Sequence, residues 1–89
     1  MNKNLFPKNL KAYREDLGLT LYTLSKNTGL SRSVLGYYER GVKNPSLYNL
    51  LILANFFEFT LNDLCTEPFL PFTKEDKEKV LAKLNKNEK

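Results

Sequence analysis

The stretch LYTLSKNTGLSRSVLGYYERG, residues 21–41, decides the fold of this chain. Thr20 and Ser31 are residue types that cap helix N-termini, and each precedes a short run whose apolar residues recur at helical spacing. Between the two runs, Gly29 supplies the left-handed residue that ends a helix. Two short helices joined by a glycine-bearing turn form a helix-turn-helix unit, so the stretch predicts one.

The residues on either side of this unit predict three further helices, over residues 7–17, 47–57 and 61–65. Pro7 suits the first turn of the first of them, and Gly18 ends it. A serine or threonine stands at the N-cap of each of the other two. Because no stretch alternates between apolar and polar residues for long enough to make a strand, we expect an all-α domain over residues 1–66.

A C-terminal extension follows, over residues 67–89. It starts with EPFLPF, whose two prolines prevent a helix while its apolar side chains favour burial. Thr73 and Asp76 then resemble a capping box in front of a helical pattern over residues 74–85. A helix of about 12 residues is marginal alone, so this one needs a surface to pack on. We therefore expect a Pro/Phe linker and a charged sixth helix, together a candidate dimerisation element.

The composition excludes most catalytic chemistry. The 89 residues suffice for one domain, include no histidine and one cysteine, and form no glycine-rich phosphate loop. Histidine-based acid–base catalysis, Cys/His zinc sites and disulfide frameworks are therefore excluded. We expect no enzyme activity, no metal, no cofactor and no small-molecule ligand.

Charge and hydropathy bear on the partner and the compartment. Lysine and arginine total 14 against 10 acidic residues, and the net charge of +4 permits a polyanionic partner without requiring one. The most apolar stretch, residues 47–59, is too short for a membrane span, which takes about 20 apolar residues. Without an export signal at the N-terminus, the cytoplasm is the expected compartment, with no membrane partner.

Three motifs carry a resemblance to a known family. They are R-x-x-L-G-L-T over residues 14–20, E-R-G-x-x-x-P-S over residues 39–46, and L-N-D-L over residues 61–64. In this order and at this spacing, residues 10–64 resemble the Cro and phage-repressor (XRE) helix-turn-helix family. The resemblance implies a five-helix, lambda-repressor-like domain that binds double-stranded DNA and regulates transcription, as a repressor, in a bacterium or bacteriophage.

In this family the second helix of the unit, here residues 31–40, enters the major groove. The resemblance and the outward face of that helix nominate four base-contacting residues: Arg32, Ser33, Gly36 and Tyr37. The resemblance also implies phosphate contacts at the helix N-termini and after the recognition helix. The residues are Thr20, Ser31, Arg40, Lys43 and Asn44. Glycine within a helix costs about 1 kcal/mol relative to alanine. Gly36 therefore serves either a close backbone approach to DNA or a packing need, and both explanations stay open.

The matching family positions also imply a salt bridge between Arg14 and Glu39 that ties the first helix to the third. Three departures from the family pattern matter, of which Ser25, in place of the usual alanine, is small enough to be harmless. Leu21 stands where a glutamine often anchors a phosphate and the recognition helix, and Glu58 stands where a glycine is expected near the end of the fourth helix.

One unit of this size covers few base pairs, so we expect a homodimer on a palindromic operator, with half-sites about 34 Å apart. The candidate interface consists of apolar residues that the predicted domain core does not require: Ile52, Phe56, Phe59, Phe69, Leu70 and Phe72. The alternative is that the Pro/Phe linker folds back and caps its own core.

A second function is compatible with the same fold. Leu21 and Gly36 favour a protein–protein interaction module, such as an antitoxin or the partner of a regulator. Duplex binding and its salt dependence distinguish the two functions.

Overall fold

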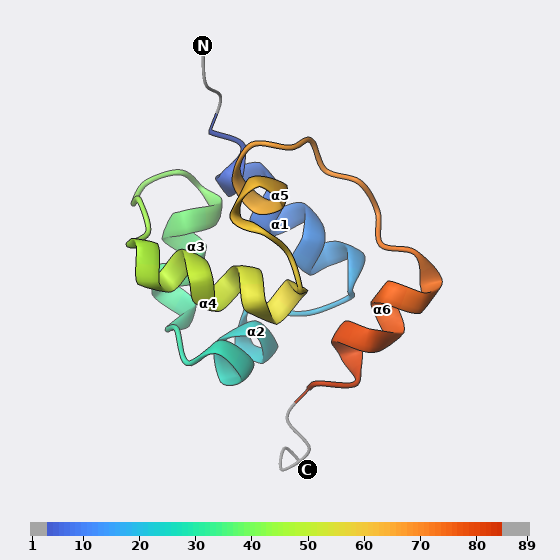
Figure 1. Ribbon diagram of the computed structural model, residues 1–89. Coiled ribbons are helices and arrows are strands. Elements are labelled where there is room, and N and C mark those ends of the chain that lie inside the picture. The colour runs from blue at the N-terminus through green and yellow to red at the C-terminus, as the bar shows by residue number, and fades with distance from the viewer. Residues whose placement is uncertain (1–3, 85–89) are drawn as a thin grey trace.

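The computed structural model describes residues 4–84 and contains six helices: α1 (Phe6–Asp16), α2 (Leu21–Thr28), α3 (Arg32–Glu39), α4 (Leu47–Phe57), α5 (Leu61–Cys65) and α6 (Lys74–Leu81) (Figure 1). No strand occurs within residues 4–84, so the predicted all-α class is confirmed. No helix in this part of the chain combines the length and the apolar character that crossing a bilayer requires.

The predicted caps and stops determine where the helices begin and end. The hydroxyls of Thr20, Ser31 and Thr60 each accept a hydrogen bond from a backbone N–H three residues later. Gly18 and Gly29 have left-handed φ angles of 73° and 81° and end the first two helices. These short-range interactions explain why the sequence pattern located these boundaries.

The predicted extent of the sixth helix is wrong. α6 ends at Leu81 rather than at residue 85, which lies outside the described residues. After Leu81 the backbone N–H groups of Lys83 and Leu84 donate to carbonyls three residues back, so the chain tightens into a turn.

Each of the first five helices places one leucine at the centre of the core. Leu10, Leu24, Leu35, Leu53 and Leu64 are all fully buried, with 0 % of their surface exposed. α3 packs against α1 and α2, while α4 packs against α2 and α5. α3 is thereby supported from behind by the first two helices, and this packing holds its outer face in place.

The linker folds back onto α1. The phenolic oxygen of Tyr13 accepts a hydrogen bond from the Leu70 N–H at 3.1 Å, and the Asp16 carboxylate accepts one from the Phe72 N–H at 2.9 Å. Beyond the linker, α6 docks through Val80, which is 1 % exposed. The extension therefore completes the same core that residues 1–66 begin.

Six apolar residues were expected at the dimer interface because the core did not require them. For three of the six, this premise is wrong. Phe56 is 7 % exposed, and the rings of Phe59 and Phe72 stack at 5.5 Å between centroids beside Tyr13 and Phe57. Phe56 packs on Phe57 within α4, and Phe59 meets Phe72 because the linker folds back onto its own core, which is the alternative stated above. Phe69 and Leu70 remain exposed, and Ile52 is half-buried.

Glu58 keeps the left-handed conformation that a glycine adopts more readily. Its φ is 67° at the C-cap of α4, and its carboxylate pairs with the Lys83 ammonium at 3.1 Å. We expect the Glu58→Gly variant to be more stable than Glu58→Ala by about 1 kcal/mol, since only glycine avoids the Cβ penalty. Urea unfolding of both variants measures this, and both lose the ion pair. Equal stabilities would contradict strain at this residue.

Candidate nucleic-acid interface

The outer face of α3 carries a shallow depression of about 230 Å³. Its lining consists of Leu21, Arg32, Ser33, Gly36, Tyr37 and Arg40. The four residues predicted to contact bases therefore lie together, with one of the predicted phosphate ligands beside them. Arg32, Ser33 and Arg40 are exposed, whereas Tyr37 is half-buried and Gly36 is buried.

Two tyrosine rings hold the cations of this face. The guanidinium of Arg32 and the ammonium of Lys26 lie 5.6 Å and 5.8 Å from the centroid of the Tyr22 ring. We call these three residues the Tyr22 cluster. Aromatic faces attract cations at such distances, so the ring restrains Arg32 before any ligand binds.

A matching group lies around Tyr37. The guanidinium of Arg40 and the ammonium of Lys43 lie 5.3 Å and 5.4 Å from the centroid of its ring. We call these three residues the Tyr37 cluster. Asn44 follows on the same loop and is exposed. The two clusters supply positive charge at separate points along α3.

Positive charge predominates in the part of the sequence that forms this face. Residues 20–45 contain four cationic side chains, Lys26, Arg32, Arg40 and Lys43, and one acidic side chain, Glu39. Glu39 is bound internally, so its charge is compensated within the fold. The face is therefore electrostatically suited to an anionic ligand.

The helix N-termini at this face are capped by exposed hydroxyls. Thr20 Oγ1 accepts a hydrogen bond from the Thr23 N–H at 3.0 Å, and Ser31 Oγ accepts one from the Val34 N–H at 3.0 Å. Each hydroxyl thus caps its helix while its side chain remains in contact with solvent. A helix N-terminus favours an anion nearby.

Gly36 lies beneath the guanidinium of Arg40. A Cβ added to this glycine would lie 3.3 Å from Arg40 Nη1 and 4.0 Å from Leu21 Cδ1. The nearest atom is the end of a flexible side chain, which can move by a few tenths of an ångström. The packing in the free protein therefore does not demand glycine here.

This geometry leads to a prediction for Gly36→Ala. We expect the free energy of unfolding to rise by up to about 1 kcal/mol, because alanine favours the helix and Arg40 can yield. Chemical denaturation measures the change, with Ser33→Ala as the control at an exposed site in the same helix. A loss of stability would instead show that the fold requires a bare backbone at this position.

The predicted ion pair between Arg14 and Glu39 is present on the inner side of α3. Arg14 Nε lies 2.7 Å from Glu39 Oε2, and Nη2 lies 3.0 Å from Oε1, so the contact is bidentate. The third nitrogen donates to the Leu19 carbonyl at 2.8 Å. The hydrogen bond that Arg14 donates to Glu39 is the largest cause of the raised pKa of Arg14. Burial acts in the opposite direction and lowers this pKa, while the negative charges of Glu39 and Glu15 raise it further. Arg14 is therefore a structural cation that joins α1 to α3.

Sequence reasoning missed Tyr22 as a member of the site. The four-residue spacing between Tyr22 and Lys26 on α2 was the available clue, since such pairs are neighbours on a helix. Its contact with Arg32 depends on how α2 crosses α3, which periodicity does not define. Leu21, beside it, is half-buried and forms an apolar part of the depression where the family often has glutamine.

Comparisons with known proteins agree with this arrangement. The helix-turn-helix family model matches residues 10–64. The chain is 39 % identical to the restriction-modification controller protein C.AhdI from Aeromonas hydrophila, over 66 % of this chain and 89 % of that one, with a TM-score of 0.62. A transcriptional regulator from Listeria innocua shares the fold, with a TM-score of 0.67 at 19 % identity, over 90 % of this chain and 75 % of that one. No curated protein sequence matches at a significant level.

The family match spans α2, the turn and α3, together with the residues of the Arg14–Glu39 ion pair that supports them. The chain therefore belongs to the XRE family of helix-turn-helix transcriptional regulators.

Proposed function

We propose that the protein is a sequence-specific transcriptional repressor that inserts α3 into the major groove of a double-stranded DNA operator as a homodimer. The observation that carries the proposal is the depression over α3, where Arg32 of the Tyr22 cluster and Tyr37 of the Tyr37 cluster lie together with Ser33. The identity shared with a restriction-modification controller protein supports control of transcription as the role.

Base reading falls to the outer face of α3. Arg32 is exposed in its first turn and can bind a guanine through two parallel hydrogen bonds. Ser33 offers a hydroxyl beside it, and Tyr37 lies one turn later. Leu21 has no polar atom on its side chain, so its part in the depression suits a thymine methyl group better than a phosphate.

Phosphate binding falls to the rim of the same face. Thr20 and Ser31 stand at helix N-termini, where a backbone anion is favoured. Arg40 and Lys43 carry positive charge after the recognition helix, and Asn44 adds an exposed amide. These contacts position the protein on DNA without reading sequence.

In the proposed homodimer, α4 is the best candidate for the contact between the two protomers. None of the 11 residues of this helix is charged, yet its apolar side chains are not all covered. Leu47, Tyr48 and Leu51 are 63 %, 72 % and 42 % exposed, and Ile52 completes the same side of the helix. We call these four residues the α4 patch. An uncharged apolar patch suits a two-fold contact, because two copies meet there without burying an unpaired charge.

The α4 patch predicts that Leu51→Glu prevents dimerisation. We expect this variant to sediment as a monomer and to bind a palindromic operator at least about 100-fold more weakly, since the two half-sites no longer act together. Leu70→Glu tests the linker surface that the sequence suggested, and we expect it to stay dimeric. A dimeric Leu51→Glu would refute the α4 patch, and a monomeric Leu70→Glu would return the interface to the linker.

Selection of bound duplexes from a random pool tests the function itself. Recovery of a two-fold symmetric site is the expected result, with the logarithm of affinity falling by several units per logarithmic unit of salt. The second candidate, a protein-binding module, rests on Leu21, which removes a polar contact from the DNA face. Failure to enrich any duplex, or binding that is insensitive to salt, would favour that candidate.

A further inference from the structure

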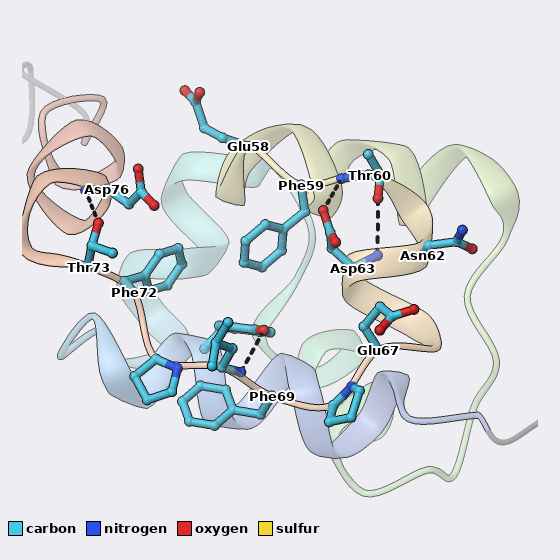
Figure 2. Close-up of a pocket in the computed structure, with 14 residues that line it drawn as sticks. Glu58, Phe59, Thr60, Asn62, Asp63, Glu67, Phe69, Phe72, Thr73 and Asp76 are labelled. Atoms are coloured by element: carbon cyan, nitrogen blue, oxygen red, sulfur yellow. Dashed lines mark hydrogen bonds between the residues drawn. The ribbon is translucent and has the colours of Figure 1, made fainter.

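We propose that a groove between α5, the linker and the start of α6 binds an arginine-bearing segment of a partner protein. The groove has a volume of about 830 Å³ and is lined by residues of α1, the α4–α5 connection, α5, the linker and α6. We call it the acidic groove. Figure 2 shows the rings of Phe59, Phe69 and Phe72 around it, with carboxylates at both ends.

The walls of the acidic groove are aromatic. Tyr13 lies 4.8 Å from Phe69 and 4.6 Å from Phe59 between ring centroids, and Phe72 stacks on Phe59. The backbone hydrogen bond from Leu70 to Tyr13 holds the linker in this position. The groove is thus formed by packed rings on a fixed backbone, and Phe69 remains 37 % exposed to a ligand.

The charges of the acidic groove have one sign. Four carboxylates line it, from Glu58, Asp63, Glu67 and Asp76, and no lysine or arginine does. Asp63 caps α5 and Glu58 pairs with Lys83. Within residues 4–84, the carboxylates of Glu67 and Asp76 make no hydrogen bond or ion pair, so they are available to a cation from outside.

Rings flanked by carboxylates suit one side chain above the others. The guanidinium of arginine stacks on aromatic faces and binds a carboxylate through two parallel hydrogen bonds. Phosphate, nucleic acid and anionic lipid are repelled by the uncompensated carboxylates of Glu67 and Asp76. Leu70, which is 74 % exposed at the rim, adds an apolar contact for a residue next to the arginine. The occupant is therefore a basic peptide segment with an apolar neighbour.

The location of the acidic groove leaves the DNA face free. Figure 1 places α3 and α6 at opposite sides of the molecule, and the groove shares no lining residue with the depression over α3. Eight of its 14 lining residues lie in residues 67–76, beyond the helix-turn-helix match over residues 10–64. The extension thus adds a second surface to the domain, and a partner held there can be bound together with DNA.

Amide NMR of the full-length, isotope-labelled protein tests the proposal, with the capped peptide Gly-Arg-Leu-Arg-Gly as the probe. We expect saturable shifts confined to residues 58–76 and the neighbourhood of Tyr13, with dissociation at millimolar concentration or below. Gly-Glu-Leu-Glu-Gly is the control and should cause none. Absence of binding by the arginine peptide, equal binding of both peptides, or shifts centred on α3 would each overturn the proposal.

Variants test which carboxylates of the acidic groove bind the arginine probe. The double variant Glu67→Gln with Asp76→Asn keeps shape and removes both free carboxylates, and we expect it to weaken the probe about tenfold. Glu78→Gln, on α6 but outside the groove, should leave affinity unchanged. Unchanged affinity in the double variant would show that these two carboxylates do not hold the arginine. An equal loss in Glu78→Gln would show that binding follows net charge rather than the groove. Neither result depends on DNA binding, so failure here leaves the proposed function intact.

Discussion

Replacing Glu39 by alanine is expected to lower the free energy of unfolding by about 3–5 kcal/mol. Only 13 % of the Arg14 side chain and 6 % of the Glu39 side chain are exposed, so the variant leaves a guanidinium charge that water reaches poorly. A domain of this size has a total stability of about 5–15 kcal/mol, and the variant should lose a large part of it. Urea unfolding at neutral pH measures the effect.

Glu15 provides a matched control for this experiment. Its carboxylate also approaches Arg14, at 3.9 Å, but 58 % of the side chain is exposed. Water already screens this contact, so we expect Glu15→Ala to change stability by less than about 1 kcal/mol. Similar losses in both variants would show that burial of the Arg14–Glu39 ion pair has no special role.

Replacing Arg32 by alanine is expected to have the largest effect on sequence reading. If each copy loses a bidentate guanine contact, operator affinity should fall by about 1–3 kcal/mol per half-site, and preference at one base pair of that half-site should relax. Stability should stay nearly unchanged, because the side chain is exposed and its contact is with the surface ring of Tyr22. Fluorescence anisotropy with the selected operator and with substituted operators measures both effects.

Lys43→Ala separates base reading from phosphate binding. Like Arg32→Ala, this variant removes one exposed cation, and in the free protein that cation lies over the ring of Tyr37. We expect it to weaken operator and random DNA alike and to reduce the salt dependence by about one unit per contact. Equal losses on operator and random DNA for Arg32→Ala would refute its role in reading a base.

The helices could be predicted because their causes are local. A threonine or serine cap acts within three residues, and a left-handed glycine acts within one turn. The family motifs then placed Arg14 opposite Glu39, and their bidentate contact is present. The end of α6 was missed, since the apolar pattern continues to Leu84 while the backbone tightens after Leu81.

The sequence by itself determined the all-α class and the helix-turn-helix unit, because caps, stops and helical spacing act between residues close along the chain. Helical spacing and the family motifs also nominated five of the six residues of the depression over α3, all except Leu21. Tertiary structure alone decided what the remaining apolar and aromatic side chains do. Phe59 and Phe72 are 13 residues apart and stack only because the linker returns to α1. Tyr22 meets Arg32 through the crossing of α2 and α3. Hydropathy describes a side chain's tendency to be buried, but the partner that buries it is chosen by the path of the whole chain.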